Sequence, residues 1–71
     1  MDDTVGKRIR AYRKLKHLTQ QEFADLLGVS VGLLGAIERG TKTCPAELIK
    51  RVGDLLQVSL EDLTSEENSR F

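Results

Sequence analysis

The sequence predicts an all-α domain built from five short helices. Apolar residues recur at intervals of three and four along most of the chain, which is the spacing of one helix face. The alternating runs of β-branched residues that are typical of strands do not occur. At 71 residues we expect a single domain over 1–71, with a compact folded core over about 4–64 and a frayed tail over 65–71.

Periodicity and capping residues define the first two helices. The first is expected over about 4–16, because apolar residues fall on one of its faces: Val5, Ile9, Tyr12 and Leu15. Thr19 and Glu22 have the spacing of a capping box, which opens a second helix. Gly28 ends that helix in the manner of a left-handed glycine. Its buried side consists of Phe23, Ala24 and Leu27.

A third helix is expected over about 30–39. Ser30 can cap its first turn, and Gly40 stops it. Leu34 and Ile37 are its inward positions.

The fourth and fifth helices complete the fold. The fourth begins near Pro45, since a missing amide costs nothing in a first turn. It carries a clear apolar stripe: Leu48, Ile49, Val52, Leu55 and Leu56. The fifth begins at Ser59, with Asp62 as its capping partner. Leu60 and Leu63 are expected to face inward.

The formal net charge of zero conceals an asymmetry along the chain. Residues 1–20 carry six cations and two acids, whereas residues 52–71 carry five acids and one cation. Such a chain can present a basic face to a polyanion while remaining neutral as a whole. A solvated basic helix would show the same pattern.

Several classes of protein are not expected. The single cysteine, Cys44, is incompatible with an internal disulfide framework or a multi-thiolate zinc site. His17 has no partner residues for catalysis or metal binding, and no nucleophilic triad or phosphate loop can be assembled. No apolar stretch approaches the length of a membrane span or resembles a signal peptide. We therefore expect a cytoplasmic protein that is not an enzyme and has no cofactor, metal or membrane partner.

The turn between the second and third helices carries the functional signal, because two short helices joined by Gly28-Val29-Ser30 fit a helix-turn-helix. The wider pattern resembles the lambda-repressor/Cro-like (XRE-type) helix-turn-helix family. The residues that carry the resemblance are Thr19-Gln20-x-x-Phe23-Ala24, Gly28-Val29-Ser30, Leu34-x-x-Ile37-Glu38-Arg39-Gly40, Pro45 and Val58-Ser59-Leu60-x-x-Leu63. They span about 4–64 and imply a lambda-repressor-like fold for a bacterial or phage transcriptional regulator that binds double-stranded DNA.

The resemblance also implies roles for individual residues. Arg13 and Glu38 would form a structural salt bridge. Gln20 would contact a backbone phosphate and brace the recognition helix, and Ser30 would open that helix. The segment Thr41, Lys42 and Thr43 would contact further phosphates. The remaining implied DNA-facing positions, all in the third helix, are Val31, Gly32, Leu33, Ala36 and Arg39.

The expected base-reading face departs from the family pattern. Val31, Gly32, Leu33, Gly35 and Ala36 have no polar side-chain group with which to distinguish base edges. Three interpretations remain open. The helix could read thymine methyls and DNA shape with help from Arg39, it could bind DNA with little sequence preference, or it could dock a protein through Leu33.

The family also implies a homodimer on a two-fold DNA site. Its contacts would come from the last two helices or the tail, where Leu60, Leu63 and Phe71 are candidates. The alternative function is a protein-interaction module on the same fold, of antirepressor or antitoxin type, with a regulatory protein as its partner.

Overall fold

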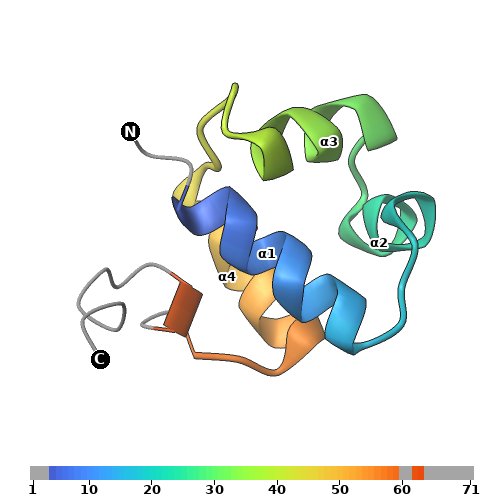
Figure 1. Ribbon diagram of the computed structural model, residues 1–71, viewed down its shortest axis with the longest axis vertical. Helices are drawn as coiled ribbons and strands as arrows, with labels where there is room; N and C mark the ends of the chain where they lie inside the picture. Colours follow the sequence, from blue (N-terminus) through green and yellow to red (C-terminus); the bar gives the residue numbers. More distant parts are fainter. Residues whose placement is uncertain (1–3, 60–61, 64–71) are drawn as a thin grey trace.

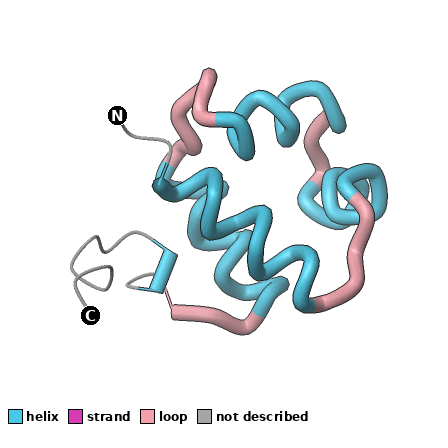
Figure 2. The backbone as a smooth tube through the Cα atoms, in the orientation of Figure 1, coloured by secondary structure: helices cyan, strands magenta, loops and turns pink. Residues whose placement is uncertain are grey.

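The computed structural model describes residues 4–59 and 62–63 and contains four helices within these ranges. They are α1 (Thr4–Leu15), α2 (Gln20–Leu27), α3 (Val31–Arg39) and α4 (Ala46–Leu56). α1 lies in front of α4 in Figure 1, with α3 above α1 and α2 at one end, where it contacts α3 and α4. Short loops connect the helices, and the described residues include no strand (Figure 2). The all-α prediction is confirmed.

One apolar core holds the four helices together. Phe23 is its largest fully buried side chain, and Ile9, Leu34 and Val52 bring α1, α3 and α4 onto it. Burying a side chain of this size contributes roughly 1.5–3 kcal/mol relative to leaving it in water. The other members of the core are Ala24, Leu27, Ile37, Cys44, Leu48, Leu56 and Leu63.

The predicted caps define the helix ends. Thr19 and Glu22 form a complete capping box, in which the Thr19 hydroxyl accepts from the Glu22 amide at 3.0 Å. Gly28 and Gly40 adopt the left-handed conformation, with φ of 79° and 83°. Pro45 is the N-cap of α4 rather than a residue of its first turn, which is a shift of one position.

The end of α1 differs from the sequence expectation. α1 ends at Leu15, and His17 follows in the left-handed region with φ of 62°. Leu15 is 69% exposed, so its assignment to the apolar face was wrong. The reason is rotation, because Leu15 lies about 120° around the helix from the buried Ile9. The buried residue in this part of α1 is instead Arg13.

The predicted fifth helix is described only in part. The Ser59 hydroxyl accepts from the Asp62 amide at 3.1 Å, and Leu63 is fully buried. Leu63 therefore belongs to the core and is not free to form a dimer contact. Leu60, Phe71 and the tail over 65–71 lie outside the described residues, so the five-helix count is not confirmed.

A glycine permits close packing of α1 on α3. A Cβ atom added to Gly6 would overlap the carbonyl oxygen of Ile37 and come within 3.0 Å of that of Glu38. Real Cβ atoms do not tolerate such distances to backbone. The last turn of α3 therefore sits directly on α1, a contact that the sequence pattern did not reveal.

Across the described ranges, 4–59 and 62–63, none of the helices is long and apolar enough to cross a membrane.

Candidate nucleic-acid interface

α2 and α3 form a tightly connected pair. The amides of Gly28 and Val29 both donate to the carbonyl of Ala24, at 2.9 and 3.0 Å, which closes the C-terminus of α2. Ser30 then caps α3, its hydroxyl accepting from the Leu33 amide at 3.0 Å. These bonds fix the direction in which α3 leaves α2, as a helix-turn-helix requires.

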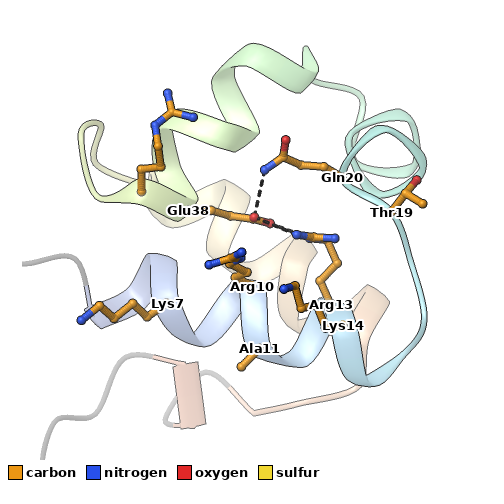
Figure 3. A pocket seen from close by; sticks show the side chains of 9 residues that line it. Lys7, Arg10, Ala11, Arg13, Lys14, Thr19, Gln20 and Glu38 are labelled. Carbon is orange, nitrogen blue, oxygen red and sulfur yellow. Dashed lines mark hydrogen bonds and ion pairs between the residues drawn. The ribbon is translucent and has the colours of Figure 1, made fainter.

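A buried ion pair joins α1 to α3 (Figure 3). The Arg13 guanidinium donates from Nε to Oε2 of Glu38 at 2.8 Å and from Nη2 to Oε1 at 3.1 Å. Its Nη1 donates to the carbonyl of Leu18 at 2.7 Å. Arg13 is 7% and Glu38 5% exposed. The ion pair expected from sequence is present, with the bidentate geometry that suits a buried arginine.

Gln20 extends this ion pair to α2. Its Nε2 donates to Oε1 of Glu38 at 3.0 Å, so one carboxylate is bonded by side chains from α1 and α2 (Figure 3). The resemblance implies that Gln20 contacts a phosphate and braces the recognition helix, and this bond joins Gln20 to α3. The glutamine is half-buried, and this bond uses one of the two hydrogens of its side-chain amide.

The outer face of α3 is smaller than the sequence suggests. Gly32 and Arg39 are exposed, whereas Val31 and Leu33 are half-buried and pack against the core. Ala36 is only 9% exposed, so its expected place on the DNA-facing surface is wrong. The loop after α3 begins at this turn, where the amides of Thr41 and Lys42 donate to the Ala36 carbonyl at 2.9 and 3.3 Å.

Polar groups cover Gly35 instead of leaving it open. A Cβ atom at Gly35 would lie 3.1 Å from Nη1 of Arg39 and 3.5–3.6 Å from the amide atoms of Gln20. The last turn of α3 is therefore lined by a guanidinium and an amide. The face that the sequence predicts to lack polar groups therefore extends only over the first half of the helix.

The loop after α3 is exposed and carries one cation, Lys42. Thr41, Lys42 and Thr43 are all exposed, and the Thr41 hydroxyl donates to the Ala36 carbonyl at 3.1 Å. The bonds to Ala36 hold this loop beside α3. Lys42 and Thr43 remain directed to solvent, where a phosphate could meet them.

An open groove lies between α1, the start of α2 and the end of α3. It is lined by cationic side chains of α1 together with Arg39 of α3, whereas the sequence pattern indicated positive charge in residues 1–20. Its lining residues are Lys7, Arg10, Ala11, Arg13, Lys14, Thr19, Gln20, Glu38 and Arg39. Lys7, Arg10 and Lys14 were not among the expected site residues. Their spacing of three and four along α1 was the available signal, since such residues share a face.

Cys44 forms no disulfide within the described part of the chain. It is free and 9% exposed, and burial raises the pKa of its thiol. A raised pKa keeps the thiol protonated and unreactive near neutral pH. Within 4–59 and 62–63, no group of three or more histidine, cysteine or acidic residues could hold a metal ion.

Comparison with known proteins agrees with this geometry. The helix-turn-helix family model (HTH_3) matches residues 9–63. The chain is 48% identical over 62 residues to YazB of Bacillus subtilis (strain 168), an uncharacterized HTH-type transcriptional regulator, covering 87% of this chain and 90% of YazB. No solved structure shows significant similarity to this chain.

Two further relatives are longer proteins. The identity is 38% over 63 residues with the antitoxin PezA of Streptococcus pneumoniae serotype 4, covering 89% of this chain and 40% of PezA. It is 35% over 65 residues with the HTH-type transcriptional regulator SinR of Bacillus subtilis (strain 168), covering 90% and 59%. The chain thus spans about half the length of these two relatives. The match over 9–63 and the similarity to YazB together establish that the chain belongs to the helix-turn-helix family of DNA-binding transcriptional regulators.

Proposed function

We propose that this regulator binds double-stranded DNA by placing α3 in the major groove. The observation that carries the proposal is the capped turn between α2 and α3, which presents an exposed α3 face beside an exposed, cationic loop. The amino-terminal half of that face is formed by Val31, Gly32 and Leu33, and Arg39 stands at its other end. Small apolar groups fit thymine methyls, and an arginine supplies donors for base edges.

Phosphate contacts are assigned to both sides of α3. Gln20 and Ser30 lie at the starts of α2 and α3, where helix amides favour an anion. Thr41, Lys42 and Thr43 lie beyond the other end of α3. Two sets of phosphate contacts flanking one recognition helix would fix its register on the duplex.

The regulator is further proposed to act as a homodimer on a two-fold site. Two recognition helices would then enter successive major grooves about 34 Å apart. Relatives that are named transcriptional regulators, YazB and SinR, support the regulatory role.

Selection from a random pool of duplex DNA at about 150 mM salt tests this function. We expect enrichment of a palindromic motif that is bound about 10³-fold or more tighter than bulk DNA. Absence of any duplex binding would overturn the proposal. Duplex binding without an enriched motif would agree with the proposed phosphate contacts, but it would contradict the proposal that α3 reads bases.

One observation favours a second function, docking of a protein partner on α3. Before Arg39, the exposed and half-exposed part of α3 carries no polar side chain, and the relative PezA is named an antitoxin. Gly32→Lys separates the two functions, because a Cβ at this position meets nothing closer than the Ser30 hydroxyl oxygen, at 4.0 Å. An added cation should leave sequence-independent duplex binding through the phosphate contacts in place, whereas it should abolish docking on an apolar surface.

A further inference from the structure

We infer that Arg51 of α4 is a positioning residue, which fixes the turn between α2 and α3 and thereby the direction of the recognition helix. The inference rests on the proposed DNA-binding function and extends it to α4, to which no role in binding is otherwise assigned. Arg51 acts through the protein's own backbone, at the last residue of α2.

The contact is a side-chain bond to the end of a helix. Nη1 of Arg51 donates to the carbonyl oxygen of Leu27 at 2.5 Å, across 24 residues of sequence. The last four carbonyl groups of an α-helix have no donor within the helix and need one from outside. The amides of Gly28 and Val29 already donate to the carbonyl of Ala24. Arg51 supplies the donor for the carbonyl at the point where α2 ends.

Charge adds to this bond. The C-terminus of a helix carries a partial negative charge, which a nearby cation stabilises. The last turn of α2 has no basic residue of its own. The guanidinium of Arg51 therefore provides from α4 the cation that α2 lacks, and the closure of α2 depends on the packing of these two helices.

Arg51 also lies against the glycine of the turn. A Cβ atom added to Gly28 would be 3.8 Å from the same Nη1 atom. Gly28 has a φ of 79°, and the chain changes direction there toward Ser30, the N-cap of α3. Val52, the next residue of α4 after Arg51, is fully buried in the core. The guanidinium thus joins the turn to a part of α4 that is itself held by packing.

The two ends of α3 are held by arginines of two different helices. Glu38 in its last turn is bonded to Arg13 of α1, whereas its first residues lie toward α2 (Figure 1). Those first residues, which include the exposed Gly32, follow directly from the turn that Arg51 contacts. The half of α3 that is proposed to face DNA is therefore the half that starts from this turn.

Hydrogen exchange of the free protein is the first test. Arg51→Met removes the donors and the charge but keeps most of the alkyl chain, and because Arg51 is exposed the core stays intact, which circular dichroism verifies. The amides of Gly28 and Val29 should exchange about three- to tenfold faster, since one hydrogen bond changes a local opening equilibrium by a factor of this order. The Val52 amide should exchange as in the wild type.

Affinity for DNA is the second test. Binding of the full chain to a random-sequence duplex would be measured by fluorescence anisotropy at several salt concentrations. We expect Arg51→Met to weaken binding about three- to tenfold at each concentration, because a less ordered turn presents α3 in its binding geometry for a smaller fraction of the time. The slope of log K against log salt should stay unchanged, since no phosphate contact is lost. Arg51→Lys keeps a cation at this position and should recover part of the affinity.

Lys50→Met is the matched control, because Lys50 is the neighbouring exposed cation of α4 and its loss removes the same charge. It should leave both the exchange of the turn and the affinity unchanged. An equal loss of affinity in Lys50→Met would overturn the inference, because net charge alone would then explain the effect.

Three results for Arg51→Met would also overturn it. Exchange at Gly28 and Val29 as in the wild type would show that Arg51 does not hold the turn. Faster exchange with unchanged affinity would show that the turn does not limit binding. A slope lowered by about 0.9 would make Arg51 a phosphate contact. A wild-type chain without duplex affinity would overturn the proposed function itself, and exchange would then decide alone whether Arg51 holds the turn.

Discussion

Gln20, the first residue of α2, donates its side-chain amide to the carboxylate of Glu38, the penultimate residue of α3, at 3.0 Å. The same carboxylate accepts two bonds from Arg13 of α1. Three helices therefore meet on one buried acid. The angle between α2 and α3, which decides how a recognition helix is presented, depends on this polar cluster as well as on the apolar core.

Loss of one partner of the ion pair should be strongly destabilising. Arg13→Ala or Glu38→Ala leaves a buried charge without its counter-ion, and we expect a loss of about 3–5 kcal/mol in the free energy of unfolding. Urea denaturation measures this loss. The double variant Arg13→Met/Glu38→Leu should recover much of it, since neither charge remains. A loss below about 1 kcal/mol in both single variants would mean that the pair behaves as a solvated one.

Two glycine substitutions should change stability in opposite directions. Gly6→Ala forces backbone apart, because the new Cβ would overlap the Ile37 carbonyl, and should cost about 1–3 kcal/mol or more. Gly32→Ala adds a methyl group in open space within a helix and should gain up to about 1 kcal/mol. The melting temperatures of the two variants, measured by thermal unfolding, test both expectations. Equal melting temperatures would contradict the close α1–α3 contact.

Lys42→Ala and Gln20→Ala should both weaken binding to duplex DNA of any sequence. Only Gln20→Ala should also lower the free energy of unfolding. Lys42 is exposed, so its loss should lower the salt slope by about 0.9 and leave unfolding unchanged. Gln20→Ala also removes a bond to a charged group, worth about 1.5–3 kcal/mol. Anisotropy and urea denaturation of the same samples separate the effects. Full wild-type affinity in both variants would disprove the phosphate assignments.

The Cys44 thiol should make stability depend on pH in alkaline solution. Burial raises its pKa above the ordinary value of 9.0, so the unfolded chain releases this proton at a lower pH than the folded chain. The resulting stabilisation is complete below about pH 9 and is lost as pH rises through the folded pKa. Relative to Cys44→Ala, wild-type stability should therefore fall as the pH rises above about 9. A constant difference in urea denaturation would show that the thiol is not shielded.

Local patterns were sufficient for most of the fold. The capping box of Thr19 and Glu22, the stop at Gly28 and the cap at Ser30 are short-range interactions, and each of them is present. Leu34, Ile37 and Phe23 are buried as periodicity predicts. Periodicity is less informative at helix ends: Leu15 lies about 120° around α1 from Ile9 and is 69% exposed, and Leu55, expected in the apolar stripe of the fourth helix, is 40% exposed. A side chain there is buried only if another element covers it.

The helix-turn-helix followed from the capping residues and spacing of two short helices, and the ion pair followed from the resemblance to the lambda-repressor/Cro-like family. The sequence by itself determined an all-α chain of the helix-turn-helix family with a basic first helix. Only the tertiary structure decided which surfaces remain open. The bond from Gln20 to Glu38, the approach of Gln20 to Gly35, and the contact of Gly6 with α3 each join residues of separate helices. Sequence periodicity records the face of a helix on which a residue lies, whereas the packing of other segments on that face decides what the residue can touch.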